Sequence, residues 1–150
     1  MPQTIDDFFK PTSTQVAEKI MGMNIEYKDG LYVVAAAKPY FGDSKQTQRK
    51  PRLMHGGIMM FNIRGFPHFC VSTGTSPEQD YFLIHRLQTK EGGVINTANG
   101  VSQALGLSFE DDGRRFTDYF GLSGKTKPSN FTKADPAGAS TCLGVYELKR

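Results

Sequence analysis

The sequence predicts an α+β domain built on a curved antiparallel sheet with a few short helices beside it. Residues 57–65, 66–72 and 81–87 form three short segments rich in Phe, Ile, Val or Tyr, each bounded by turn residues. A half-buried pleated surface and its turns require this composition, so the three segments predict an antiparallel meander. The chain has 150 residues, enough to bury a core but too few for a second domain. We therefore expect one domain spanning residues 1–150.

The first helix is expected to begin after Thr12, because Thr12 and Gln15 have the spacing of a capping box. Apolar residues then recur at helical intervals from Val16 to Ile20. Gly22 can end the helix, since glycine readily adopts the left-handed conformation found at helix ends. This pattern predicts a short helix with one buried face.

A β-hairpin is expected next. Residues 24–28 and 31–35 have strand composition and flank Asp29-Gly30, a pair that tolerates the positive φ values of a tight hairpin turn. The second strand is expected to continue toward Tyr40.

The part of the chain after the meander has fewer signals. Asn99 can cap a helix that runs to about Leu105, with Gly106 as its end. Residues 121–141 alternate Gly, Ser, Lys, Pro and Ala without apolar period, so no element is predicted there. Residues 142–148 predict a last strand.

The net charge of +3 and the pI near 8.9 suit a polyanionic partner without demanding one. The polar stretch 42–52 is expected to be a loop, and it concentrates basic residues. Solvated loop surface and a phosphate-facing surface are equal alternatives for this group. Its members are Lys45, Arg49, Lys50 and Arg52.

The sequence also bears on location. Residues 1–7 lack a basic segment followed by an apolar one, so they do not predict a secretory signal. No apolar run approaches the length needed to cross a bilayer. Of the two cysteines, Cys70 and Cys142, neither belongs to a metal-ligand motif. We expect a cytoplasmic protein with no membrane partner, no metal and no cofactor.

The order of residues along the chain resembles a known family. The matching positions in the meander are Gly57, Phe61, Gly65, Phe69-Cys70, Leu83-Ile84 and Glu91-Gly92. In this order they resemble the central hairpin of the 3-methyladenine (alkyladenine) DNA glycosylases. Matches on both sides, such as Phe8-Phe9, Tyr40-Phe41-Gly42 and 103–107, extend the resemblance over roughly residues 8–118.

The resemblance implies the glycosylase fold and a pocket for a base. In this family a flipped nucleotide stacks between aromatic rings, and a Glu two residues before one ring activates the attacking water. The matching stretch here is Lys38-Pro39-Tyr40, which keeps the aromatic ring and lacks the Glu. A Lys ammonium has no acceptor lone pair with which to take a proton from water. The resemblance therefore implies a short member without the usual catalytic base.

Other family positions differ as well. The loop 43–52 has no His where the family has one, and the family's wedge Tyr falls on Arg64. The remaining positions imply a ligand pocket in which aromatic rings hold a base and Lys38 meets a phosphate. Each of these residues also has a structural alternative, as core aromatic, strand histidine or surface charge. The candidate ligand-binding residues are Lys38, Tyr40, Phe61, Arg64, Ser72 and His85.

Three functions are compatible with these residues. The preferred one is a phage-type or accessory protein that holds a nucleotide or nucleotide-derived small molecule without cleaving it, because site chemistry outranks fold analogy. The first alternative is an active DNA glycosylase that binds duplex DNA and uses the Lys38 amine as the nucleophile, with Asp43 or Glu26 for acid-base work. The second alternative is a protein-interaction module in which Tyr40 and Phe61 are ordinary core. No catalytic residue is expected unless Lys38 is one.

Overall fold

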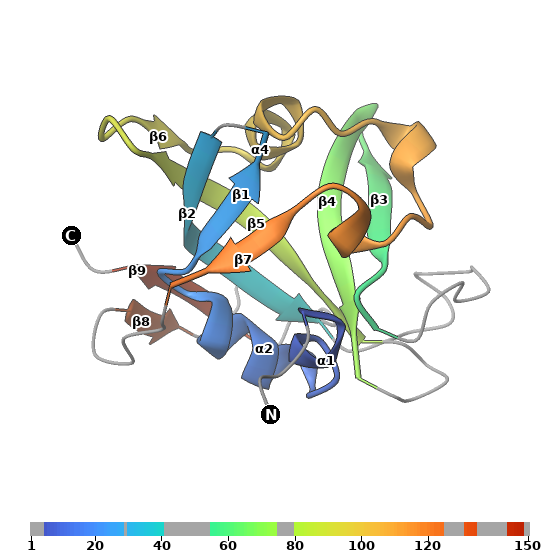
Figure 1. Cartoon of the computed structure of the whole chain (residues 1–150), viewed down its shortest axis with the longest axis horizontal. Coiled ribbons are helices and arrows are strands. Elements are labelled where there is room, and N and C mark those ends of the chain that lie inside the picture. Colours follow the sequence, from blue (N-terminus) through green and yellow to red (C-terminus); the bar gives the residue numbers. More distant parts are fainter. Residues whose placement is uncertain are drawn as a thin grey trace.

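An antiparallel sheet curls around the centre of the molecule in the computed structural model (Figure 1). The structure describes residues 5–28, 30–40, 55–74, 80–124, 131–134 and 144–148. Within these ranges the sheet has nine strands. They are β1 (Asn24–Tyr27), β2 (Gly30–Tyr40), β3 (Ile58–Ile63), β4 (Phe66–Thr73), β5 (Asp80–Thr89), β6 (Val94–Ile95), β7 (Gly121–Ser123), β8 (Phe131–Ala134) and β9 (Val145–Leu148).

The strand order is β3-β4-β5-β2-β1-β7, with β6 added to β5 and the β8–β9 hairpin added to β2 through β9. The long strand β2 therefore pairs with three strands: β1, β5 and β9. The helices are α1 (Ile5–Phe8), α2 (Ser13–Ile20) and α4 (Ala98–Ala104), with the short 3₁₀ helices η1 (Phe109–Asp111) and η2 (Phe116–Asp118). Figure 1 shows α1 and α2 at one end of the sheet and α4 at the other.

The segment 113–123 joins the two outer edges of the sheet. At one end, the Ile58 N–H donates to the Arg114 carbonyl oxygen at 2.7 Å, beside the first residues of β3. At the other end, β7 pairs with β1. The chain between them carries Phe116 and Phe120 into the core, where they are 0% and 4% exposed. This segment therefore covers the concave side of the sheet.

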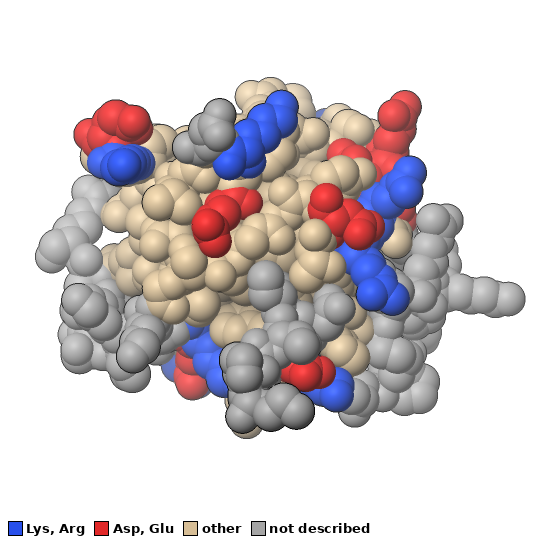
Figure 2. Space-filling model, viewed as in Figure 1, with Lys and Arg blue, Asp and Glu red and all other residues tan. Residues whose placement is uncertain are grey.

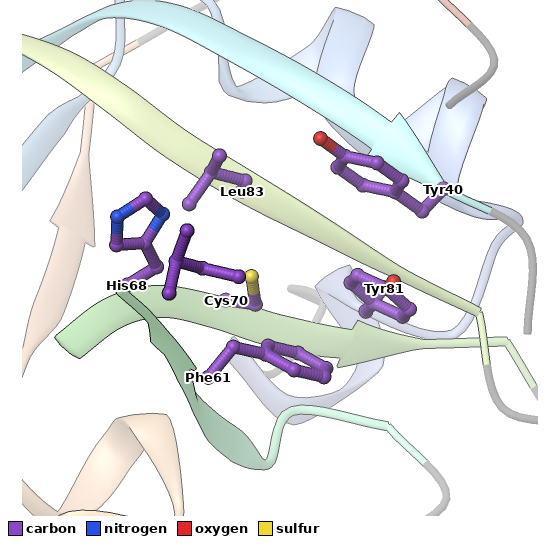
Figure 3. Close-up of a pocket in the computed structure, with 7 residues that line it drawn as sticks. Tyr40, Phe61, His68, Cys70, Tyr81 and Leu83 are labelled. Atoms are coloured by element: carbon purple, nitrogen blue, oxygen red, sulfur yellow. The ribbon is translucent and has the colours of Figure 1, made fainter. Parts of the chain in front are cut away.

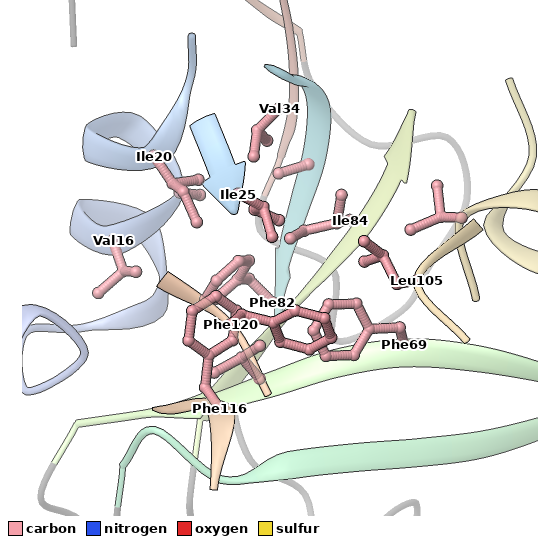
Figure 4. Close-up of a cluster of buried hydrophobic side chains, with 14 of the residues drawn as sticks. Val16, Ile20, Ile25, Val34, Phe69, Phe82, Ile84, Leu105, Phe116 and Phe120 are labelled. Atoms are coloured by element: carbon pink, nitrogen blue, oxygen red, sulfur yellow. The ribbon is translucent and has the colours of Figure 1, made fainter. Parts of the chain in front are cut away.

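The main hydrophobic core lies between this concave face, α2, α4 and the 113–123 segment (Figure 4). Val16 and Ile20 reach it from α2, and Leu105 reaches it from the end of α4. Aromatic rings fill its centre, with Phe116 and Phe120 in contact at a centroid distance of 5.1 Å. Burial of these large apolar side chains supplies the main stabilisation of the fold.

The α+β class and the antiparallel meander are confirmed. The three predicted segments are β3, β4 and β5, paired in sequence order. The predicted capping box is present, because the Thr12 hydroxyl accepts from the Gln15 N–H and the Gln15 side chain accepts from the Thr12 N–H. Gly22 ends that helix with a φ of 81°, and Gly106 follows α4 with a φ of 66°.

Two local predictions were wrong by one or two residues. In the β1–β2 hairpin Tyr27 pairs with Gly30, so Gly30 already belongs to β2 and is not a turn residue. Lys28 adopts the positive φ, 53°, that we expected of Gly30. The cap of α4 is Thr97, whose hydroxyl accepts from the Gly100 N–H at 2.9 Å, and Asn99 lies inside the helix. Both Thr and Asn cap helices, so residue preference alone did not distinguish them.

The stretch 121–141 also contains more structure than predicted, since β7 and β8 both lie in it. These strands have no apolar pattern of their own and are held by pairing with β1 and β9. The last strand, β9, begins at Val145, and Cys142 lies outside the described residues.

Candidate functional site

The convex face of the sheet carries a second, smaller hydrophobic cluster. Side chains alternate across a strand, so the residues between core positions of β3, β4 and β5 point away from the main core. Partly buried hydrophobic side chains complete this cluster at its margin. The buried members are Met59, Cys70, Tyr81 and Leu83, and the partly buried ones are Tyr40, Phe61 and Ala98.

A cavity of about 330 Å³ opens on this face (Figure 3). Its lining is aromatic and aliphatic, and the polar groups of the lining residues are two phenol hydroxyls, one imidazole and one thiol. Ligand sites for small molecules have this size and this mixture of apolar walls with few polar groups. The lining residues are Tyr40, Phe61, Ile63, His68, Cys70, Tyr81 and Leu83.

Three of the lining rings form a row. The Tyr40 and Tyr81 rings stack with centroids 5.0 Å apart and an interplanar angle of 11°. The Tyr81 and Phe61 rings are also 5.0 Å apart, at 31°. Figure 3 shows Tyr81 between the other two. The space where a base would be sandwiched by Tyr40 and Phe61 is therefore occupied by the Tyr81 ring, and only the two end rings are partly exposed.

The strand register places Lys38 and His85 beside this cavity, although neither lines it. Lys38 of β2 pairs with Leu83 of β5, and Leu83 pairs with Cys70 of β4. His85 follows Leu83 by two residues, and His68 precedes Cys70 by two, so both share the face of their neighbours. His68 thus lines the cavity, and Lys38 and His85 lie next to it on the same face.

The electrostatics of the two histidines reflect this arrangement. Burial and the positive charges of Lys38 and Arg86 lower the pKa of His85 to about 4. Burial and Lys38 also lower the pKa of His68. Both imidazoles are therefore predominantly neutral at neutral pH, and each then offers one donor and one acceptor nitrogen.

An irregularity in the pairing of β2 with β5 lies next to His85. Ile84 and Leu87 are both fully buried in the main core although they are three residues apart. The register between β2 and β5 shifts on both sides of Ala36, which pairs with Arg86. Two consecutive residues, His85 and Arg86, therefore lie between core positions and are only partly buried.

Ser72 and Arg64 occupy different surroundings. Ser72 is 1% exposed, and its hydroxyl accepts a hydrogen bond from the Gly57 N–H at 2.8 Å, which fixes the start of β3 against β4. Arg64 lies with Gly65 at the exposed tip of the β3–β4 hairpin and has a φ of 55°. The Gly65 N–H donates to the Asn62 side chain at 2.8 Å, which closes this turn.

The predicted basic loop lies outside the described residues, with its members Lys45, Arg49, Lys50 and Arg52. Asp43 lies outside them too. On the face shown in Figure 2, acidic and basic side chains of the described residues are interspersed and form no broad patch of one sign.

Within the described ranges no group of three or more His, Cys, Asp or Glu side chains is arranged to hold a metal ion. None of the helices described is both long enough and apolar enough to span a bilayer.

Sequence reasoning did not select five of the cavity residues, namely Tyr81, Cys70, Leu83, Ile63 and His68. Side chains alternate between the two faces of a strand, and this alternation in the meander could have indicated most of these residues. Leu83 and Tyr81 are two and four residues before His85, so they share its face, and a spacing of two residues also links His68 and Cys70. Their meeting across strands depends on register, which single strands do not specify.

Comparison with protein-family models finds no match to this chain, and comparison with curated proteins finds none either.

Proposed function

We propose that the protein binds a nucleotide or nucleotide-derived small molecule without cleaving it, as a phage-type or accessory protein that sequesters its ligand would do. The observation that carries this proposal is a cavity walled by three aromatic rings with a lysine ammonium beside it. Aromatic rings stack with nucleobases irrespective of sequence, and an ammonium binds phosphate oxygens.

The ring row limits where a base binds. Tyr81 is covered by Tyr40 and Phe61 on its two sides, at 5.0 Å each. A base therefore stacks on an end ring, Tyr40 or Phe61, rather than between them. This geometry suits a single base or a mononucleotide in a cavity of about 330 Å³.

The lining favours holding over hydrolysis. None of the described residues that line the cavity carries a carboxylate, the group that serves as the water-activating base in the resembled family. Lys38, which stands at that base's place in the sequence, has no lone pair while protonated. We therefore infer binding without turnover.

Titration of the purified protein with adenosine and adenosine 5′-monophosphate tests this proposal by calorimetry. Removing the end ring on which the base stacks, by Tyr40→Ala or by Phe61→Ala, should weaken binding by about 1 to 3 kcal/mol, the contribution of one base–aromatic stack. Tyr119→Ala is the matched control, since Tyr119 is a partly exposed tyrosine outside the cavity. Equal affinity of all three variants, or no binding by the unmutated protein, would contradict the proposal.

A further inference from the structure

We infer that Lys38, His68 and His85 form an oxyanion subsite at one end of the cavity, and that this subsite takes up a proton when it binds an anion. The inference rests on the proposed function and deepens it by naming the chemistry of the ligand's second part. The ligand class is a planar ring carrying a phosphodiester, phosphate or similar oxyanion, rather than a neutral base or nucleoside.

The geometry comes from three neighbouring strands. The pairs Lys38–Leu83 and Leu83–Cys70 run across β2, β5 and β4 in one line. His85 and His68 each lie two residues from this line and on the same face. His68 itself lines the cavity, so an anion that enters there meets an imidazole and has the Lys38 ammonium close by.

The charge at this end of the cavity is not balanced by the described residues. Arg86 has a carboxylate partner, Glu147, at 3.6 Å, and its Nε donates to the Asn96 side-chain oxygen at 2.6 Å. Lys38 has no carboxylate within ion-pair distance in the described part of the chain. The Nδ1 atom of His85 is buried, and none of the described groups hydrogen-bonds to it. One cation and one ring nitrogen without a hydrogen-bond partner among the described residues thus lie beside this end of the cavity.

The charged groups around the two imidazoles are few. Besides Lys38 on β2 and Arg86 on β5, Glu147 on β9 pairs with Arg86. The strands β3 and β6 and the helix α4 carry no ionisable side chain. Helix α2 packs on the opposite face of the sheet, in the main core. The positive field of Lys38 is therefore the main field acting on both histidines from a neighbouring element.

Anion binding reverses the sign of this field. Positive neighbours and burial lower the pKa of His85 to about 4 in the free protein. A bound anion favours the imidazolium, so it raises the pKa of both histidines. A group with a higher pKa in the bound state binds its proton together with the ligand, so affinity rises as pH falls. If His85 regains its ordinary value of 6.5, affinity increases about tenfold between pH 8 and pH 5.5.

The test compares 3′,5′-cyclic adenosine monophosphate, whose single negative charge is fixed over this range, with neutral adenosine and with inorganic sulfate. We expect the affinity for the cyclic nucleotide to rise about tenfold from pH 8 to pH 5.5, while that for adenosine stays nearly constant. The His68→Asn/His85→Asn double variant should lose this dependence. The chain has three histidines, so His55→Asn is the matched control and should keep it.

If the affinities for the cyclic nucleotide and for adenosine depend on pH in the same way, the subsite is overturned and the proposed function is not. Sulfate binding with proton uptake, without binding of either adenosine compound, would support the subsite and overturn the nucleotide proposal. No binding of any of the three probes would overturn both. If the double variant does not fold, the imidazole proton resonances of the unmutated protein decide: the pKa of His85 should rise on adding the anion, and an unchanged pKa would overturn the inference.

Discussion

Replacing Tyr81 by alanine should cost stability and open the space between Tyr40 and Phe61. Tyr81 is 6% exposed, and its ring contacts both neighbours at 5.0 Å. Truncating a buried large aromatic residue to alanine costs about 3 to 5 kcal/mol. The ring borders an existing cavity, where its neighbours can relax, so we expect the lower end of this range, about 3 kcal/mol. Urea unfolding of the two proteins gives the value.

The same variant should gain stability from a planar ligand. The gap left by Tyr81 lies between two rings, so a flat molecule such as adenine or indole can stack on both. A ligand at one hundred times its dissociation constant stabilises the folded state by about 2.7 kcal/mol. Adding it should therefore recover most of the loss in Tyr81→Ala.

The matched control is Phe82→Ala, at the next position of β5 but in the main core. Phe82 is 0% exposed, so its loss should destabilise the protein by a similar amount, about 3 to 5 kcal/mol, but a planar ligand should not restore it preferentially. A cost below about 1 kcal/mol for Tyr81→Ala would refute the described ring row. So would equal rescue of both variants by the ligand.

Three further predictions concern stability, measured by urea unfolding. Thr97→Ala should lower the free energy of unfolding by about 1 kcal/mol and Asn99→Ala by less than half of that, because Thr97 caps α4. The reverse order would indicate that Asn99 is the cap, as the sequence predicted. Gly65→Ala should lower the free energy of unfolding by about 1 kcal/mol, through the positive φ alone. Gly106→Ala should lower it at least twice as much, because a Cβ at position 106 would also meet the hydroxyl of Tyr27. Equal losses for the two variants would contradict the close approach of Tyr27 to Gly106. Lowering the pH from 6.5 to about 4 should reduce the free energy of unfolding by on the order of 1 to 3 kcal/mol through His85, because the unfolded chain binds a proton there at higher pH than the folded protein does. His85→Asn should make the free energy of unfolding less dependent on pH in this range. An unchanged pH dependence would contradict the burial of the neutral ring.

Local signals predicted the parts of the fold that local physics determines. The capping box at Thr12 and Gln15 and the left-handed glycines at 22 and 106 depend on residues within a turn of one another. The meander followed from strand composition bounded by turn residues. The hairpin turn was displaced by one residue because Lys28 adopts a positive φ that propensity assigns to glycine.

The parts that failed depend on distant partners. Strands β7 and β8 have no apolar pattern, and they form because β1 and β9 offer them hydrogen-bonding edges. Phe116 and Phe120 become core residues only because the chain between the sheet edges passes over the concave face. Neither relation is visible in a single segment.

In the candidate site, too, some features could be predicted from the sequence and others depend on distant partners. Tyr40, Phe61, Lys38 and His85 were selected through the resemblance, and the register brings all four to one face. That Tyr81 lies between Tyr40 and Phe61 could not be predicted, because it requires the pairing of β2 with β5 as well as the direction of a side chain.

Native mass spectrometry of the protein, isolated from cells and then mixed with an equimolar set of nucleotides, tests the central claim most directly. We expect a one-to-one complex with a single nucleotide that the Tyr40→Ala/Phe61→Ala double variant fails to retain under the same conditions. Tyr119→Ala should retain it. Bare protein in every sample, or a complex that the double variant holds as well as the unmutated protein does, would contradict the claim that this cavity is a nucleotide-binding site.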